Sequence, residues 1–124
     1  EWCIEPRNPA WLNGAYFGLL RRLGTGHVFQ QGYYMPPVWS VFGQNADKLP
    51  DLVVIRLHGP DRERMDERAG KDWSKIVEAR DGEIAALAGM LQDLRNHGRK
   101  TWLFVNNHYE GCAPLTIKRL REQL

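Results

Sequence analysis

Polar side chains that could bind a ligand or move a proton follow the apolar runs of this sequence, at the points where each run ends. The clearest case is the stretch 101–111, in which Thr-Trp-Leu-Phe-Val gives way abruptly to Asn-Asn-His and a turn that a glycine closes. Arginine suits the binding of anions, and imidazole and carboxylate groups suit proton transfer. The candidate residues are Glu5, Arg7, Gln30, Gln31, Arg56, His58, Asn106, Asn107 and His108.

Three pairs of these candidates have the spacing of strand neighbours. Side chains two apart in a strand point to the same face, so Arg56 and His58 share a face, as do Asn106 and His108. Glu5 and Arg7 share a face as well if the strand geometry persists past Pro6. An arginine inside a strand of a parallel sheet needs a partner, because an unpaired buried guanidinium is costly. Glu5 is the obvious partner. The group could therefore be a buried polar network of Glu5, Arg56 and Asn106 that fixes strand register, or it could line a pocket.

The pocket interpretation predicts an acid–base enzyme that acts on a small anionic or sugar-like substrate. Arg7 and Arg56 would bind the anion, and His58 or His108 would move the proton near neutral pH, where histidine titrates. Glu5 would orient these groups or act as the base. Asn106 and Asn107 follow the last strand and are further candidates for substrate binding, although Asn107 should point away from the shared face and hold the turn.

Two other functions remain open. The same pocket could belong to a metabolite-binding or sensing module without chemistry, in which residues 33–42 or 61–72 would close as a lid. A metal-dependent phosphodiester hydrolase is the third possibility, because two histidines and Glu5 could bind a divalent metal. The spacing of these residues matches no recognisable metal signature, so we expect no cofactor from the sequence, and no Walker loop, GxGxxG or GxSxG occurs.

Composition narrows the class of protein. The 124 residues include 43% hydrophobic residues, which is enough for the core of one domain. The 17 basic and 15 acidic residues give a net charge of +2, which argues against a nucleic-acid partner. The apolar runs are too short to span a bilayer, and residues 1–6 do not resemble a signal peptide. We therefore expect a cytoplasmic protein with a small-molecule ligand.

The candidates must be positioned by alternating strands and helices. Strands are expected at residues 2–5, 27–30, 52–57 and 101–105, and helices at 8–23, 81–97 and 113–124. Residues 33–49 read as a loop with room for one short helix, and residues 61–72 as a solvated charged loop. Strands alternating with helices predict an α/β fold with parallel strands, whose sites lie beyond the carboxyl ends of the strands.

Several single residues carry expectations of their own. Cys3 is expected to be a small core residue, whereas Cys112 could be a nucleophile near a helix N-terminus, although no motif supports it. His27 and His97 are expected at the surface. Asp81 is expected to cap the helix that follows it. The apolar candidates of the last helix are Leu115, Ile117 and Leu120.

Three motifs resemble those of a known family. Residues 5–11 read Glu-Pro-Arg-Asn-Pro-Ala-Trp and are similar to its E-x-R-x-x-x-W segment; residues 56–59 match its R-x-H-G strand end; residues 106–113 resemble its N-N-H-x-x-G-x-A signature. The family is the YecE-like family, the domain of unknown function seventy-two. The chain departs from the pattern at Pro60 and Cys112. The resemblance implies a TIM-like α/β barrel of uncharacterised function, with the candidate residues lining the barrel mouth.

The chain is too short to form such a barrel. A complete eight-stranded barrel takes roughly 200 residues or more, whereas periodicity here indicates about four strands. We therefore expect residues 1–124 to form a single domain that is the C-terminal half of a TIM-like barrel. A half-barrel has two open sheet edges, so the fragment should associate with another copy or need its missing N-terminal half.

Overall fold

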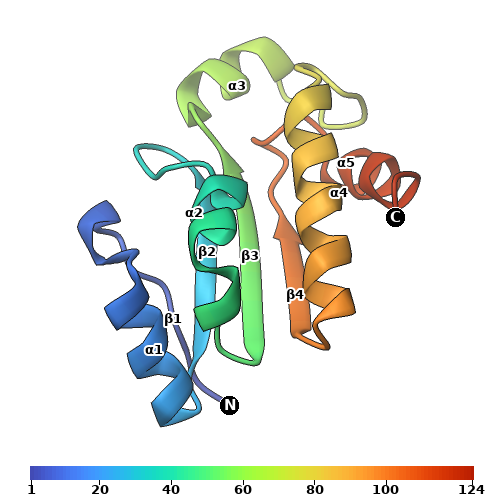
Figure 1. The fold of residues 1–124 in the computed structure, drawn as a ribbon. Coiled ribbons are helices and arrows are strands. Elements are labelled where there is room, and N and C mark those ends of the chain that lie inside the picture. Colours follow the sequence, from blue (N-terminus) through green and yellow to red (C-terminus); the bar gives the residue numbers. More distant parts are fainter.

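Four strands form one parallel sheet in the computed structural model, which describes residues 1–124 (Figure 1). The strands lie in chain order, and each pairs in parallel with the next. This order confirms the expected α/β architecture of four parallel strands with flanking helices. The strands are β1 (Cys3–Ile4), β2 (Gly26–Gly32), β3 (Leu52–Gly59) and β4 (Lys100–Val105).

The helices lie against one face of the sheet and along its two sides (Figure 1). In this view α2 and α4 lie in front of the strands, α1 beside β1, and α5 beyond β4, while α3 crosses the end of β3. None of the helices is both long and apolar enough to cross a membrane. The helices are η1 (Pro9–Trp11), α1 (Gly14–Leu23), α2 (Val38–Asn45), η2 (Ala46–Lys48), α3 (Arg62–Ala69), α4 (Asp81–Asn96) and α5 (Ala113–Arg121).

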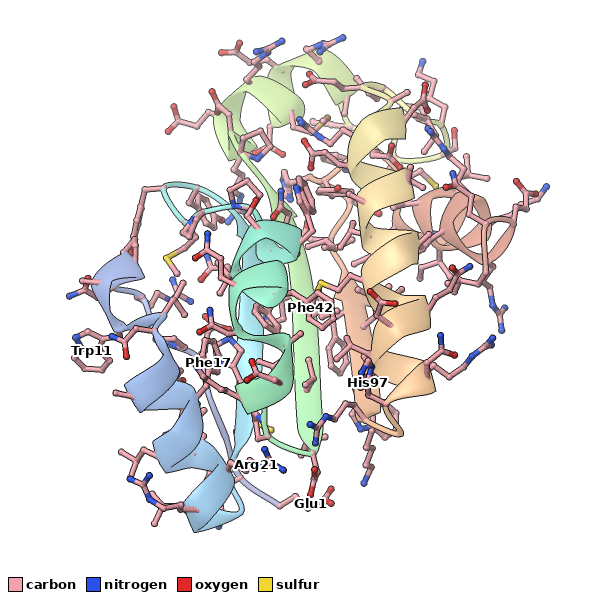
Figure 2. The ribbon with its side chains drawn as sticks, viewed as in Figure 1. Glu1, Trp11, Phe17, Arg21, Phe42 and His97 are labelled. Carbon is pink, nitrogen blue, oxygen red and sulfur yellow. The ribbon has the colours of Figure 1, made fainter.

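The two faces of the sheet differ sharply in burial. On the face that the helices cover, called the outer face here, Val53, Ile55 and Leu57 of β3 are at most 1% exposed. The core lies between this face and the helices, and Figure 2 labels Phe17 and Phe42 within it. On the opposite, inner face, Trp102 and Phe104 are 54% and 57% exposed. The candidate site therefore lies on the inner face, which no helix of this chain covers.

The first helix begins later than expected. Asn8 and Pro9 start only the short helix η1, and α1 begins after Asn13, whose side chain accepts hydrogen bonds from the backbone N–H groups of Ala15 and Tyr16. Asn13 therefore caps a second helix, and residues 8–23, expected to form one helix, form two. The helix ends before Gly24, as predicted, because that glycine adopts a left-handed conformation.

The charged stretch 61–72 is a helix, so its interpretation as a loop was wrong. Asp61 accepts a hydrogen bond from the backbone N–H of Arg64 and caps α3, and Gly70 ends it. Met65 and Ala69, four residues apart, bury one side of the helix. Residues 33–49 were expected to be a loop with room for one short helix, and they contain two, of which α2 buries three apolar side chains in the core.

Several other expectations were also wrong. Asp81 is the first residue of α4, which Arg80 precedes as the cap residue without a side-chain bond. His27 is fully buried because its strand lies beneath α1, although His97 is exposed as expected.

Cys3 is exposed because it lies on the uncovered inner face of the edge strand β1. On α5, Leu120 is buried, but Ile117 is 39% exposed.

Candidate functional site

Three backbone segments meet closely where the strands end. Gly59 has a φ of +86°, and a Cβ on it would lie 2.3 Å from the backbone oxygen of His108. Gly32, at the end of β2, has a φ of +128° and would place a Cβ 2.3 Å from the backbone oxygen of Gly59. Only glycine combines these conformations with so close an approach. The two glycines therefore allow the ends of β2, β3 and β4 to converge.

Glu5 joins two arginines at this end of the sheet. One carboxylate oxygen accepts a hydrogen bond from Arg56 at 2.5 Å, and the other accepts two from Arg7 at 2.7 and 3.0 Å. Burial raises the pKa of Glu5, but the hydrogen bonds and charges of Arg56 and Arg7 together hold that pKa below its usual value. The expected partnership of Glu5 with Arg56 is thus confirmed. Two guanidinium groups share one carboxylate, which leaves the cluster with a net positive charge.

His58 follows Arg56 on the same inner face of β3. Its Nε2 atom is buried and has no hydrogen-bond partner, and its ring lies 5.7 Å from the ring of Tyr33. Burial lowers the pKa of His58, and the charges of Arg56 and Arg7 lower it further against the opposing effect of Glu5. These effects favour the neutral imidazole of His58, and its buried Nε2 has no partner within the protein.

His108 has a different environment. Its Nδ1 lies 2.6 Å from Oδ1 of Asn106, and its Nε2 lies 2.7 Å from Oδ1 of Asp66 on α3. The backbone N–H of His108 also donates to Asn106 Oδ1, which identifies that atom as an acceptor. The ring of Trp73 packs edge-on against the imidazole at 5.0 Å. Both ring nitrogens of His108 are thus engaged by the protein itself.

Asn107 serves the turn rather than the inner face. Its side-chain oxygen accepts a hydrogen bond of 2.8 Å from the backbone N–H of Ala113, the first residue of α5. Its backbone oxygen accepts another from Gly111. These bonds are those expected of a residue that holds the turn. Cys112, the cap residue of α5, is buried next to this turn.

A cavity of about 110 Å³ lies between the ends of β3 and β4. Arg56 and His58 line it from one strand, and Phe104 and Asn106 from the other. Glu5 and Arg7 reach it through Arg56, whereas His108 connects to it through Asn106. Glu5, Arg7 and Arg56 thus form one group beside this cavity, and Asn106 and His108 form another. Gln30 lies beside Arg56 in the adjacent strand, with a buried Oε1 that has no partner.

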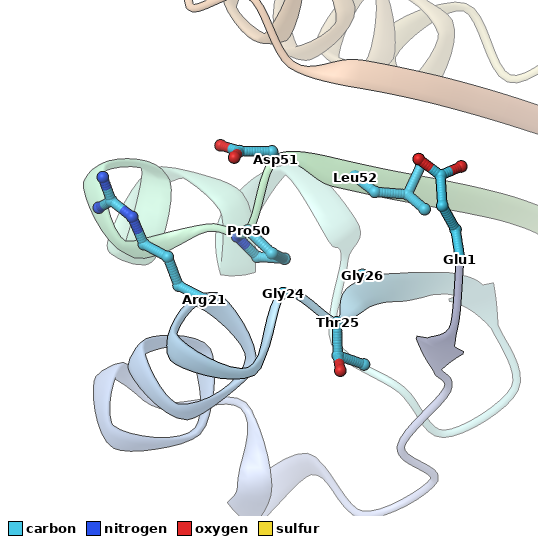
Figure 3. A pocket seen from close by; sticks show the side chains of 8 residues that line it. All are labelled: Glu1, Arg21, Gly24, Thr25, Gly26, Pro50, Asp51 and Leu52. Carbon is cyan, nitrogen blue, oxygen red and sulfur yellow. The ribbon is translucent and has the colours of Figure 1, made fainter.

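A second cavity lies at the opposite end of the sheet. Figure 3 shows this hollow of about 120 Å³, where Glu1, Arg21 and Asp51 surround the starts of β2 and β3. No histidine is among the residues that line it. Sites in parallel α/β folds lie at the carboxyl ends of strands, so the cavity at Arg56 and His58 remains the candidate.

The sequence did not reveal the network that holds the turn after β4. Glu110 is fully buried and accepts hydrogen bonds from the backbone N–H of Arg80 and the hydroxyl of Thr116, both at 2.8 Å. The hydroxyl of Tyr109 donates to Glu83, and burial is the main cause that raises the pKa of Tyr109. Glu110 and Tyr109 lie within the recognised motif, but nothing in the spacing indicated their burial.

No three of the His, Cys, Asp and Glu side chains lie close enough together to hold a metal ion. Glu5 is occupied by two arginines, and His108 is occupied by Asn106 and Asp66. The residues proposed as metal ligands therefore do not form a metal centre in this chain. The hydrolase alternative would need ligands from elsewhere.

Comparison with known proteins gives a family but no activity. Two crystal structures of a DUF72 family protein from Enterococcus faecalis match the fold with TM-scores of 0.67 and 0.62, each at 18% sequence identity. The matches cover 98% and 97% of this chain but only 46% and 47% of the neighbours, so the chain spans about half their length. No curated protein matches the sequence. The model of the family "Protein of unknown function DUF72" matches residues 1–124, and the chain therefore belongs to the DUF72 family.

Proposed function

We propose that this chain carries an anion-binding site for acid–base chemistry on a small anionic or sugar-like substrate. The supporting observation is that Arg56 and His58, two residues apart on β3, line the same cavity, where burial lowers the pKa of His58. Arg56 and Arg7 attract the anion because Glu5 balances only one of their two charges. A group that is neutral at pH 7 and lacks a partner is suited to accept a proton.

The two candidate histidines have unequal roles in this proposal. His58 is the proton carrier because its Nε2 is free, whereas the ring nitrogens of His108 are both engaged. Glu5 is a positioning residue that holds the two arginines, since its carboxylate is bound on both oxygens. Asn106 lines the cavity and offers its amide group to the substrate.

Binding is tested with inorganic phosphate as the probe. Titration of the chain with phosphate, followed by backbone amide NMR, should shift signals of residues 56, 58 and 106 and leave those at the opposite end of the sheet unchanged. Arg56→Gln should abolish these shifts. Arg95→Gln is the matched control, because Arg95 is exposed on α4 far from the cavity. Shifts that persist in Arg56→Gln would remove Arg56 from the site.

Chemistry is tested by screening small phosphorylated and carboxylated sugars for turnover. His58→Gln should keep phosphate binding and lose turnover of any substrate found, whereas His108→Gln should retain part of it. Equal turnover by His58→Gln and the unmodified chain would exclude His58 as the proton carrier.

A binding module without chemistry is the second candidate. One observation favours it: His108, one of only two histidines near the cavity, is held between Asn106 and Asp66. Phosphate binding without turnover of any compound in the screen is the result that this candidate predicts.

A further inference from the structure

Tyr33 has a backbone conformation that bulky residues rarely adopt. It lies in the turn between β2 and α2, where the backbone N–H of Met35 donates a hydrogen bond of 3.3 Å to the oxygen of Gly32 (Figure 1). Its φ is +55°, and Tyr33 and Lys71 are the two residues other than glycine with a positive φ. The first central position of such a turn usually holds glycine, because a side chain there costs free energy. A strained residue of this kind beside a cavity points to a function of its side chain.

The ring of Tyr33 lies beside the candidate site. Its centroid is 5.7 Å from that of the His58 imidazole, with 35° between the two planes. Tyr33 nevertheless remains 47% exposed, so part of its ring is free to contact a ligand. The neighbouring Tyr34 fixes the turn, because its hydroxyl donates a hydrogen bond of 3.0 Å to the backbone oxygen of Arg7. The turn is therefore held against the segment of one arginine of the site and against its histidine.

The cavity at Arg56 and His58 is too small to enclose a complete substrate. Its volume is about 110 Å³. Cavities that enclose small ligands have volumes of roughly 300 Å³ or more. A substrate whose anionic group lies in this cavity must therefore extend past its margin. The exposed ring of Tyr33 lies at this margin, beside His58, and the C–H groups on the face of a sugar ring pack well on an aromatic ring.

Gln30 adds a hydrogen-bond acceptor that a bare anion does not satisfy. It pairs in register with Arg56 on the neighbouring strand, is 4% exposed, and has a buried Oε1 without a partner. An amide oxygen accepts hydrogen bonds and does not donate them. A carboxylate or a fully ionised phosphate therefore suits the guanidinium of Arg56 but not Gln30, whereas a hydroxyl group can donate to Oε1. The two side chains together suit a substrate that carries both an anionic group and hydroxyl groups.

We propose that the substrate of this site is a sugar with an anionic group, and that Tyr33 selects its ring. The inference rests on the function proposed above, because Arg56 and Arg7 hold the anionic group. A hydroxyl group of the sugar donates to Gln30, and the sugar ring packs on the exposed part of Tyr33. A glycine at position 33 would relieve the strain of the turn but would offer no surface to the ring.

Binding of matched probes, measured by isothermal titration calorimetry, tests the role of Tyr33. Glucose 6-phosphate and glucuronate carry a ring and an anionic group, whereas glycerol 3-phosphate has no ring. At least one of the two sugars should bind about tenfold more tightly than glycerol 3-phosphate, and the sugar that does so identifies the anionic group. Tyr33→Leu should remove most of this difference, and Tyr33→Phe should keep it. Inorganic phosphate should bind equally to all three proteins.

Gln30→Leu tests the hydroxyl contact separately. This variant should fold, because leucine replaces a buried acceptor that has no partner. It should weaken the binding of the sugar several-fold and leave the binding of inorganic phosphate unchanged. Equal sugar binding by Gln30→Leu and the unmodified chain would contradict the hydroxyl contact.

Urea denaturation separates the strain of the turn from the loss of the ring. Tyr33→Ala and Tyr33→Gly both lack the ring, but only glycine relieves the positive φ. Tyr33→Gly should therefore unfold at a higher urea concentration than Tyr33→Ala, while both should bind the sugar as weakly as Tyr33→Leu. Lys71→Gly is the matched control, because it relieves a φ of +71° at an exposed position after α3. It should gain stability without any change in sugar binding.

Three results would overturn this inference while the function proposed above stands. Glycerol 3-phosphate that binds as tightly as both sugars would show that the site does not recognise a ring. Sugar binding that survives Tyr33→Leu and Tyr33→Ala would place the ring elsewhere. Adenosine 5′-monophosphate that binds more tightly than both sugars would show that Tyr33 stacks on a base. Absence of binding by inorganic phosphate would instead overturn the function proposed above, so the two failures are distinguishable.

Discussion

His108 Nε2 lies 2.7 Å from Oδ1 of Asp66, although 42 positions separate the two residues in the sequence. This contact joins the turn after β4 to α3, which crosses the end of β3 (Figure 1). Asn106 holds the other ring nitrogen of His108, so the imidazole bridges a cavity residue and the helix above it. The stability of α3 is therefore connected to the candidate site.

The first prediction concerns Asp66→Asn, which removes the carboxylate that faces His108. We expect backbone amides of α3 to exchange several-fold faster, because the hydrogen bond between His108 and the carboxylate is lost. Asp66 is half exposed, so the free energy of unfolding should change by only about 1 kcal/mol or less. Glu67→Gln is the control, since Glu67 is exposed on the same helix and makes no ion pair. Equal exchange in both variants would show that the contact does not hold α3.

The second prediction concerns the pKa of His58, measured from the NMR signals of its ring. Burial is the largest cause of the lowered pKa, and the charges nearby add effects of opposite sign. Arg56→Gln removes a positive charge and should raise the pKa. Glu5→Gln removes a negative charge and should lower it further. Shifts in the same direction for both variants would contradict this arrangement of charges.

The Glu5–Arg56 pair is an example of a contact that could be predicted from the sequence. An arginine within Val-Val-Ile-Arg-Leu-His demands a partner in a parallel sheet, and the polar end of the first strand offers one. The same argument placed Arg56 and His58 on one face, and the structure agrees. These predictions succeeded because strand alternation and the cost of burying charge are local rules with few solutions.

The environments of Asp66 and Cys3 could not be predicted from such local rules. Apolar residues hardly recur at helical spacing in residues 61–72. The sequence alone therefore indicated neither the helix α3 nor its contact with His108. Cys3 was expected in the core because it lies in an apolar strand pattern, but the inner face of β1 has no cover within this chain. The burial of Glu110 likewise depends on where α4 and α5 pack, which composition does not determine.

The third prediction concerns the stability of the protein in mild acid. Burial lowers the pKa of His27 from 6.5 to about 3, and its Nε2 has no partner to stabilise a charge. Between these values the unfolded chain binds a proton that the folded chain does not. The contribution of His27 to the free energy of unfolding is therefore fully present above pH 6.5 and is lost as the pH falls toward 3.

Urea denaturation between pH 7 and pH 5 measures this effect. His27 alone should account for a slope of at most about 1.4 kcal/mol per pH unit below pH 6.5. His27→Phe should be less stable at pH 7, because the contact with Tyr16 is lost, but its stability should fall less on acidification. His97→Gln replaces an exposed histidine and should leave the slope unchanged. An unaltered slope in His27→Phe would assign the acid sensitivity to another group.

The fourth prediction concerns Glu110, whose carboxylate ties two helices to the turn that carries Asn106 and His108. One oxygen accepts the backbone N–H of Arg80 before α4 and faces Arg119 at 3.2 Å, and the other accepts the hydroxyl of Thr116 on α5. Glu110→Gln turns one acceptor into a donor inside a fully buried site. We expect a loss of about 2–4 kcal/mol in the free energy of unfolding, because at least one donor is left unpaired.

Thr116→Val isolates one part of this network. It removes a single donor to Glu110 and should cost about 1 kcal/mol in the unmodified chain. In the Glu110→Gln background it should cost clearly less, because residues of one hydrogen-bond network do not contribute additively. Urea denaturation of the four proteins gives the coupling energy directly. Additive losses would mean that Glu110 stabilises the turn through Arg80 and Arg119 alone, without Thr116.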